Sequence, residues 1–128
     1  MKNILYLVFV FTGLSCSQSN VQAQTKLSPG DFQTMLAKDK TVQLVDVRTP
    51  EEYKAGHLEG ARLIDYYESD FAAQIAKLDK TKPVMVYCAA GGRSGSAASQ
   101  LSKLGFKNVY DLSGGIRAWR SAGKPTVQ

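Results

Sequence analysis

Apolar residues along the chain fall into two patterns that alternate from one end to the other. In the first pattern they form short continuous runs rich in valine, leucine and tyrosine, which are typical of strands buried on both faces. In the second they recur every three or four positions, which predicts amphipathic helices. Strands are expected over residues 42–47, 62–64, 83–87 and 108–112, and helices are expected to begin after Ser28, Thr49 and Ser69, near residue 93 and near Ile116.

Two of the helix starts carry the same signature. Ser28 and Thr49 each precede a proline, and a hydroxyl cap followed by proline favours a helix N-terminus. Asp31 and Glu52 stand three residues after these caps, where an acidic side chain reaches back to the cap. Glycines are expected to end three helices, at Gly56, Gly105 and Gly123. Inward faces are expected at Phe71, Ile75 and Leu78 and at Ala97, Ala98, Leu101 and Leu104.

The alternation of the two patterns predicts the fold class. Strands that alternate with helices join through crossover connections, which produce a largely parallel sheet. The chain has 128 residues, which is enough for one domain and leaves little room for a second. We therefore predict an α/β fold of three layers, in which a mostly parallel sheet of four or five strands carries helices on both faces.

The start of the chain differs from the rest. Lys2 precedes an apolar run over residues 4–14, which is too short for a membrane-spanning helix and typical of a secretory signal peptide. A signal peptide over residues 1–23 would leave 24–128 as the folded domain. Alternatively, Cys16 resembles the lipid-modified cysteine of a bacterial lipoprotein, and an uncleaved apolar helix is the remaining alternative. The first two predict an exported protein, either periplasmic or anchored to a bacterial membrane.

Positive charge in the chain is mild and scattered. Removing residues 1–23 takes away Lys2 alone, so the formal net charge falls from +5 to +4. A nucleic-acid-binding surface would show a denser basic face, so no nucleic-acid partner is expected. We expect a solvated surface that tolerates anionic substrates, with membrane contact only through a lipid on Cys16.

Cys88 would be the only cysteine left after cleavage, so its reactivity has to be considered. It follows the strand at 83–87, at the edge where open α/β sheets bind ligands. A helix beginning at Arg93 or Ser94 would direct its free amides and its dipole at the sulfur, which favours a thiolate. The alternative is a buried structural cysteine, but such a residue needs neither the glycine turn nor the arginine that follows it.

The residues after Cys88 are expected to form an anion-binding cradle. Gly91 and Gly92 can adopt positive φ and turn successive amides inward, and Arg93 adds a fixed positive charge at the rim. With Cys88 as the nucleophile, the predicted substrate-binding residues are Ala89, Ala90, Gly91, Gly92, Arg93 and Ser94.

Three motifs of the chain resemble those of the rhodanese family. Residues 44–53 and 56–61 resemble the first signature of the family, residues 86–94 resemble its active-site loop, and residues 112–119 resemble its closing motif. The resemblance runs over nearly the whole chain after the leader. It implies a single-domain rhodanese, without the inactive partner domain of tandem members.

The resemblance implies sulfur transfer through a persulfide on Cys88. A small-molecule donor such as thiosulfate or a persulfide would supply a sulfane sulfur, and cyanide or a thiol would accept it. No metal or organic cofactor is implied, and a thioredoxin-like protein is a partner to consider. Many thiosulfate-using members carry a basic residue directly after the cysteine, whereas this loop has Ala89 and Ala90. Thiosulfate is therefore expected to bind less well here.

Two alternatives to an enzyme of this kind stay open. Four residues separate Cys88 from Arg93, whereas the related phosphatases have one more, so the ring is expected to be too tight for phosphate. A phosphatase-like enzyme is accordingly the weaker alternative. The stronger one is a persulfide carrier or sulfur-sensing interaction module that does not turn over.

Other positions are expected to support the loop. Asp46 and Arg48, at the end of the neighbouring strand, would brace the loop or Arg93 through a salt bridge. His57 is expected to fix a turn and not to act as a base or a metal ligand. Smaller roles are expected for Trp119 in the core, for Gly114 and Gly115 beside the loop, and for Tyr66 and Tyr67 at its rim.

Overall fold

The computed structural model describes residues 24–128 of the chain. Over these residues every strand is followed by a helix, from the first element to the last. The strands are β1 (Thr25–Leu27), β2 (Gln43–Asp46), β3 (Arg62–Leu63), β4 (Val84–Tyr87) and β5 (Val109–Leu112). The helices are α1 (Pro29–Lys38), α2 (Pro50–Lys54), α3 (Phe71–Ala76), α4 (Gly92–Lys103) and α5 (Gly115–Ser121).

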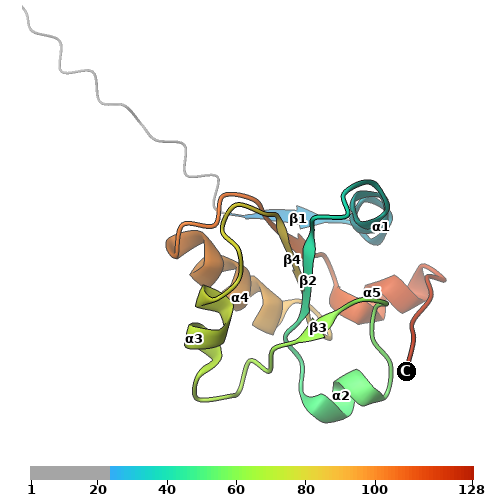
Figure 1. The fold of residues 1–128 in the computed structure, drawn as a ribbon. Coiled ribbons are helices and arrows are strands. Elements are labelled where there is room, and N and C mark those ends of the chain that lie inside the picture. The colour runs from blue at the N-terminus through green and yellow to red at the C-terminus, as the bar shows by residue number, and fades with distance from the viewer. Residues whose placement is uncertain (1–23) are drawn as a thin grey trace, which may run out of the picture.

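The strands form one parallel sheet in the order β1-β5-β4-β2-β3. β4 lies at its centre, and all of its residues are buried, as expected for an apolar strand covered on both faces. Figure 1 shows α3 and α4 on one side of the sheet and α1 and α5 on the other. The predicted α/β class, the layers and the parallel sheet are confirmed.

Alternate residues of β4 contribute to two separate cores. Val84 and Val86 pack on the side of α3 and α4, whereas Met85 and Tyr87 pack on the side of α1 and α5. Trp119 is buried in the second core, as predicted. Because both faces of β4 are packed against helices, the position of the residue that follows its carboxyl end is well fixed.

The helix caps predicted at Ser28 and Thr49 are present. The Ser28 hydroxyl accepts a hydrogen bond from the Asp31 amide at 3.2 Å. Thr49 and Glu52 form a reciprocal capping box at the start of α2. Both α1 and α2 have a proline in their first turn. Local sequence chemistry therefore sets where these helices begin.

Two predictions about the later helices are wrong. α3 is capped by Asp70 and not by Ser69, and no side chain bonds to its first amides, because a tight turn over residues 66–70 precedes the helix. Leu104 is 37% exposed and lies outside the core, because α4 ends there and Phe106 folds back to fill the space.

β1 was not expected from the hydrophobic pattern. This strand has three residues and lies at the edge of the sheet that residues 24–128 form, where it pairs with β5. Alternation over so few residues is too short to distinguish a strand from a loop. Pairing with β5 adds a fifth strand to the sheet.

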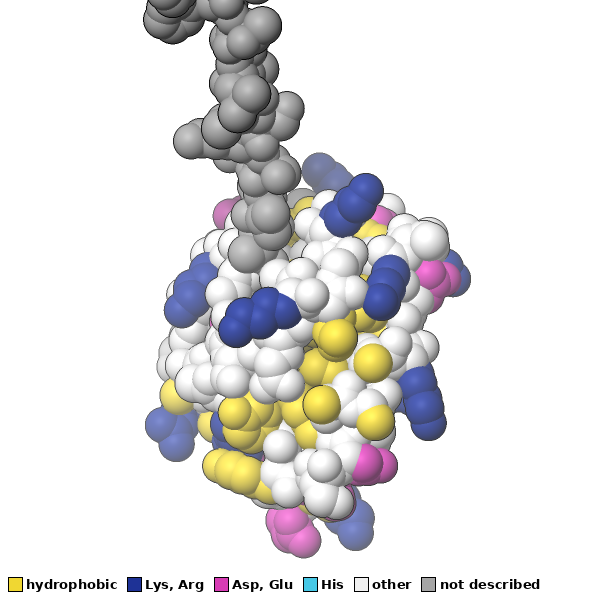
Figure 2. Space-filling model, turned by 90° about the vertical axis from the view of Figure 1, so that its left-hand side faces the viewer, with side chains coloured by type: hydrophobic (Ala, Val, Ile, Leu, Met, Phe, Trp, Pro, Cys, Tyr) yellow, Lys and Arg dark blue, Asp and Glu magenta, His cyan; other side chains and the backbone are white. Residues whose placement is uncertain are grey.

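The predictions for the leader and for Cys16 lie outside the described residues. Within residues 24–128, no helix combines the length and apolar character that crossing a bilayer requires. Figure 2 shows the face formed by α3 and α4, on which lysine and arginine side chains stand apart from one another around scattered hydrophobic ones.

Candidate active site

Cys88 lies at a point where the connections leaving the sheet change direction. The loop after β4 leads to α4 on one face, whereas the loops after the neighbouring strands β2 and β5 lead to helices that pack on the other face. Loops that diverge in this way leave a crevice at the carboxyl ends of the strands, which is where open α/β sheets bind ligands. The predicted nucleophile therefore stands at the expected place.

The Cys88 sulfur accepts two hydrogen bonds from the loop that follows it. The Gly91 amide donates to Sγ at 3.0 Å and the Ser94 hydroxyl donates at 3.3 Å. Burial by itself raises the pKa of the Cys88 thiol, but hydrogen bonds from Ser94, Gly91 and the Ala90 amide outweigh it, so this pKa lies below its ordinary value. The residue is only 1% exposed, so these donors face no competition from bulk water.

A single glycine turns the loop into α4. Gly91 caps the helix with φ of 119°, a left-handed conformation that other residues rarely adopt. Gly92 is already the first residue of α4 and has no positive φ, so the prediction of two such glycines is wrong. One change of direction is enough to bring the Gly91 amide and the Ser94 hydroxyl onto the same sulfur.

The turn between β5 and α5 holds the other side of the loop. The Cys88 and Ala89 carbonyls accept hydrogen bonds from the amides of Ile116 and Arg117, at 2.9 and 3.1 Å. A Cβ on Gly115 would stand 2.5 Å from the Ala89 carbonyl group. The predicted close passage beside the loop is therefore confirmed for Gly115, which must lack a side chain, whereas a Cβ on Gly114 would meet Ala118 and not the loop.

Asp46 and Arg48 form a buried ion pair with each other. Arg48 Nη2 lies 2.7 Å from Asp46 Oδ2 and also donates to the Gly56 carbonyl at 2.7 Å. The guanidinium lies over the Tyr87 ring, 5.6 Å from its centroid. The pair therefore ties the end of β2 to the turn after α2 and to β4. The expectation that it would reach Arg93 is wrong.

Arg93 is paired with Glu52 instead. Its two terminal nitrogens donate to the two carboxylate oxygens of Glu52 at 2.7 and 3.0 Å. Tyr67, which is 68% exposed, has its ring 5.6 Å from the Arg93 guanidinium. From the sequence, Glu52 was expected only to cap α2. Its place in the first turn after β2, next to the loop after β4, is the signal that could have identified the pair.

His57 is held in a structural role. Its Nδ1 lies 2.9 Å from the Tyr53 carbonyl, and its ring stacks on that of Tyr53 with centroids 3.7 Å apart. Its backbone pairs with Val127 near the end of the chain. These contacts agree with the expected turn. In residues 24–128, no cluster of histidine, cysteine and carboxylate side chains could hold a metal ion.

Asp111 is a buried carboxyl behind the loop that the sequence analysis missed. Its Oδ1 has no hydrogen-bond partner among the described residues, and its Oδ2 lies 3.8 Å from the position of a Cβ on Gly95. Burial raises the pKa of Asp111, although a hydrogen bond with Ser94 and the charge of Lys26 oppose that rise. An aspartate inside the apolar run of β5 was the available signal.

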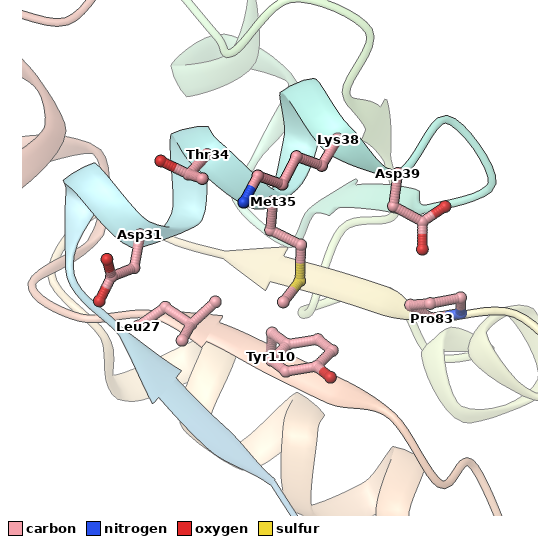
Figure 3. Close-up of a pocket in the computed structure, with 8 residues that line it drawn as sticks. All are labelled: Leu27, Asp31, Thr34, Met35, Lys38, Asp39, Pro83 and Tyr110. Atoms are coloured by element: carbon pink, nitrogen blue, oxygen red, sulfur yellow. The ribbon is translucent and has the colours of Figure 1, made fainter.

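A pocket of about 380 Å³ lies elsewhere in the molecule. It is lined by side chains of α1, β1 and β5, among them Met35 and Tyr110, which point toward each other in Figure 3. The pocket reaches Pro83, which precedes β4, whereas Cys88 follows that strand. Because no residue of the loop lines it, this pocket is separate from the candidate nucleophile.

Comparison with known sequences gives consistent matches. The family described as the rhodanese-like domain matches residues 28–122. Thiosulfate sulfurtransferase GlpE of Pseudomonas paraeruginosa is 41% identical over 85 residues, which are 66% of this chain and 74% of that protein. The probable adenylyltransferase/sulfurtransferase MoeZ of Mycobacterium tuberculosis is 32% identical over 101 residues, which are 79% of this chain and 26% of that protein.

Solved structures have the same fold. A rhodanese-related protein from Thermoplasma volcanium matches with a TM-score of 0.71 and 30% identity, over 80% of this chain and 97% of that one. The polysulfide-sulfur transferase homodimer of Wolinella succinogenes matches with a TM-score of 0.70 and 31% identity, over 82% of this chain and 79% of that one.

Proposed function

The chain belongs to the family of rhodanese-like domains and is a sulfurtransferase, and from that premise we propose that Cys88 carries the transferred sulfur as a persulfide. The Cys88 thiolate attacks the outer sulfur of a donor such as thiosulfate or a persulfide. A new S–S bond forms at Cys88, the S–S bond of the donor breaks, and its electron pair leaves on sulfite or on a thiolate. Cyanide or a thiolate then attacks the terminal sulfur and restores the Cys88 thiolate.

The observation that carries this proposal is the pair of hydrogen bonds on Cys88 Sγ, from the Gly91 amide at 3.0 Å and the Ser94 hydroxyl at 3.3 Å. Donors in these positions stabilise a sulfur anion before the reaction. The same donors remain in place when the negative charge moves to the terminal sulfur of a persulfide. A packing cysteine has no need of them.

The surroundings of the loop support a rigid site. The amides of Ile116 and Arg117 hold the carbonyls of Cys88 and Ala89, so the loop keeps its shape when the sulfur changes charge. A preorganised group of donors costs little rearrangement during the reaction, which is the main advantage of main-chain amides over mobile side chains. The six-residue loop from Cys88 to Arg93 suits one added sulfur atom better than a phosphate group.

Mass spectrometry of the purified domain tests the persulfide directly. After treatment with thiosulfate or with an alkyl persulfide, the Cys88 peptide of the wild type is expected to gain the mass of one sulfur atom. Cys88→Ser is expected to gain nothing. Discharge of the added sulfur by cyanide or by a thiol, at a rate that matches steady-state turnover, separates an enzyme from a persulfide carrier.

Two outcomes would contradict the proposal. One is an unmodified Cys88 peptide in a protein that turns over sulfur donors. The other is hydrolysis of an aryl phosphate in place of sulfur transfer. The thiol acceptor in the cell, including a thioredoxin-like protein, is identified in the same assay by the acceptor that discharges Cys88 fastest.

Export of the enzyme is part of the proposal. The basic start and the apolar run of residues 4–14 support a signal sequence, cleaved after Ala23 or before a lipid-modified Cys16. The mass of the N-terminal peptide from protein isolated from its own envelope distinguishes the two. A peptide that begins at Met1 contradicts both.

A further inference from the structure

The cation closest to Cys88 in sequence is already occupied by a carboxylate. Both terminal nitrogens of Arg93 donate to Glu52, at 2.7 and 3.0 Å, so the two groups meet fork to fork. This geometry orients the guanidinium and cancels its charge. The positive charge that the sequence placed at the rim of the loop is therefore paired within the protein.

Glu52 is fixed from its other side as well. Its Oε1 accepts hydrogen bonds from the Thr49 amide at 3.3 Å and from the Thr49 hydroxyl at 3.2 Å, which form the cap of α2. Chiefly through the bond to Arg93, the pKa of Glu52 falls to about 2, so the carboxylate is charged at every physiological pH. Moving Glu52 away from Arg93 would also disturb the cap.

The loop itself has no second cation between Cys88 and Arg93. The ion pair of Asp46 with Arg48 is buried, and its two charges cancel each other. Ala89 and Ala90 add no charge to the loop. The groups that touch the sulfur itself are dipoles, and the charge of Arg93 is cancelled by Glu52.

Building on the persulfide chemistry above, we propose that Glu52 is a specificity-determining residue, which by neutralising Arg93 selects alkyl persulfides over thiosulfate as sulfur donors. Thiosulfate brings two negative charges, whereas an alkyl persulfide brings at most one. In the reaction Cys88–S⁻ attacks the outer sulfur of R–S–SH, Cys88–S–SH forms, and R–S⁻ leaves with the electron pair of the broken bond. Charge and atoms balance without any further reactant.

The substitution Glu52→Gln tests this selection. Glutamine retains the capping role, since it serves at the same position of a capping box. Removing the negative charge frees Arg93, and the gain in attraction grows with the charge of the donor. We expect kcat/KM to rise about ten-fold for thiosulfate and about three-fold for 2-hydroxyethyl persulfide, with cyanide as acceptor.

Glu51→Gln is the matched control. Glu51 is the preceding residue of α2, is exposed, and forms no ion pair within residues 24–128, so its loss removes the same charge from the same helix turn. We expect this variant to change neither donor by more than about 1.5-fold. Thermal unfolding of both variants verifies that they remain folded.

Several outcomes overturn the inference. One is a wild type whose kcat/KM is higher for thiosulfate than for 2-hydroxyethyl persulfide. Another is a ratio of these two kcat/KM values that stays unchanged in Glu52→Gln. Should that variant not fold, the salt dependence of the wild type decides. A neutral site predicts a kcat/KM for thiosulfate that is nearly flat with ionic strength, and a steep fall contradicts it. Failure of both donors to modify Cys88 in the mass measurement overturns the persulfide itself, which is a separate result.

Discussion

The ends of two neighbouring strands, β2 and β4, are built from opposite kinds of polar group. After β2 the chain places charged side chains, and Asp46 and Arg48 are buried against each other. After β4 it places a sulfur whose partners are a main-chain amide and a hydroxyl. One end therefore contains full charges that are cancelled, and the other contains dipoles that are available.

The difference teaches how this fold separates support from chemistry. A permanent charge inside a protein is tolerated only when an opposite charge and further hydrogen bonds accompany it. Within residues 24–128, no side-chain cation forms an ion pair with the sulfur, and its hydrogen-bond partners are an amide and a hydroxyl. Amide and hydroxyl dipoles stabilise the anion and do not neutralise it. The charged end holds the structure and the dipolar end is suited to react.

The largest effect is expected at the charged end. Arg48→Met leaves the Asp46 carboxylate buried without its partner, and we expect the free energy of unfolding to fall by about 3 to 5 kcal/mol. Urea denaturation measures this loss of free energy of unfolding. The double variant Asp46→Asn with Arg48→Met removes both charges and is expected to recover most of the loss. A single variant as stable as the wild type would show that the pair does not hold this end.

An intermediate effect is expected at the dipolar end. Ser94→Ala removes the hydroxyl donor to Cys88 Sγ and a hydrogen-bond partner of Asp111, so the pKa of the thiol is expected to rise and the free energy of unfolding to fall by about 1 to 3 kcal/mol. At a pH below the pKa of the wild-type thiol the thiolate fraction then falls, and alkylation by iodoacetamide slows several-fold. At high pH the two rates are expected to converge.

Ser96→Ala is the control for this measurement. The Ser96 hydroxyl lies 3.0 Å from the Tyr66 hydroxyl and not on the sulfur, so its loss is expected to leave the alkylation profile unchanged. Equal profiles for Ser94→Ala and the wild type would mean that main-chain amides alone stabilise the thiolate.

The smallest effect is expected behind the loop, at Asp111. Burial raises the pKa of this carboxyl, so the folded state holds the proton more tightly than the unfolded state does. Stability is then complete below the ordinary pKa near 4 and is lost as the pH rises through the folded value. We expect Asp111→Asn to raise Tm by a few degrees at pH 7 and by less toward pH 4. The exposed Glu59→Gln is the control, and an equal gain in it contradicts the assignment.

Much of the fold could be predicted because it depends on short stretches of sequence. Each helix whose cap was predicted correctly has a hydroxyl and a proline next to its first turn, as at Ser28 and Thr49. The wrong cap at Ser69 lies where a tight turn competes with the helix start. Leu104 continued a helical spacing past the end of α4, which periodicity alone does not reveal.

The candidate site was predicted less completely. Cys88 and its loop follow one strand, and they could be recognised in a single segment. The partner of Arg93 could not, because Glu52 is 41 residues away and belongs to a different connection. The carboxyl of Asp111 was missed for the same reason, since its neighbour Ser94 lies on α4 and Asp111 lies on β5.

What the sequence by itself determined is the order of strands and helices, most helix starts, and the place of a lone reactive cysteine after a buried strand. These follow from side-chain spacing and backbone preferences within a few residues. Only the tertiary structure decided which charges meet. Glu52 neutralises Arg93 because β2 and β4 are neighbours in the sheet. The two strands are adjacent because the sheet buries both of its apolar faces under helices from the whole chain. No pattern within a few residues reveals this adjacency.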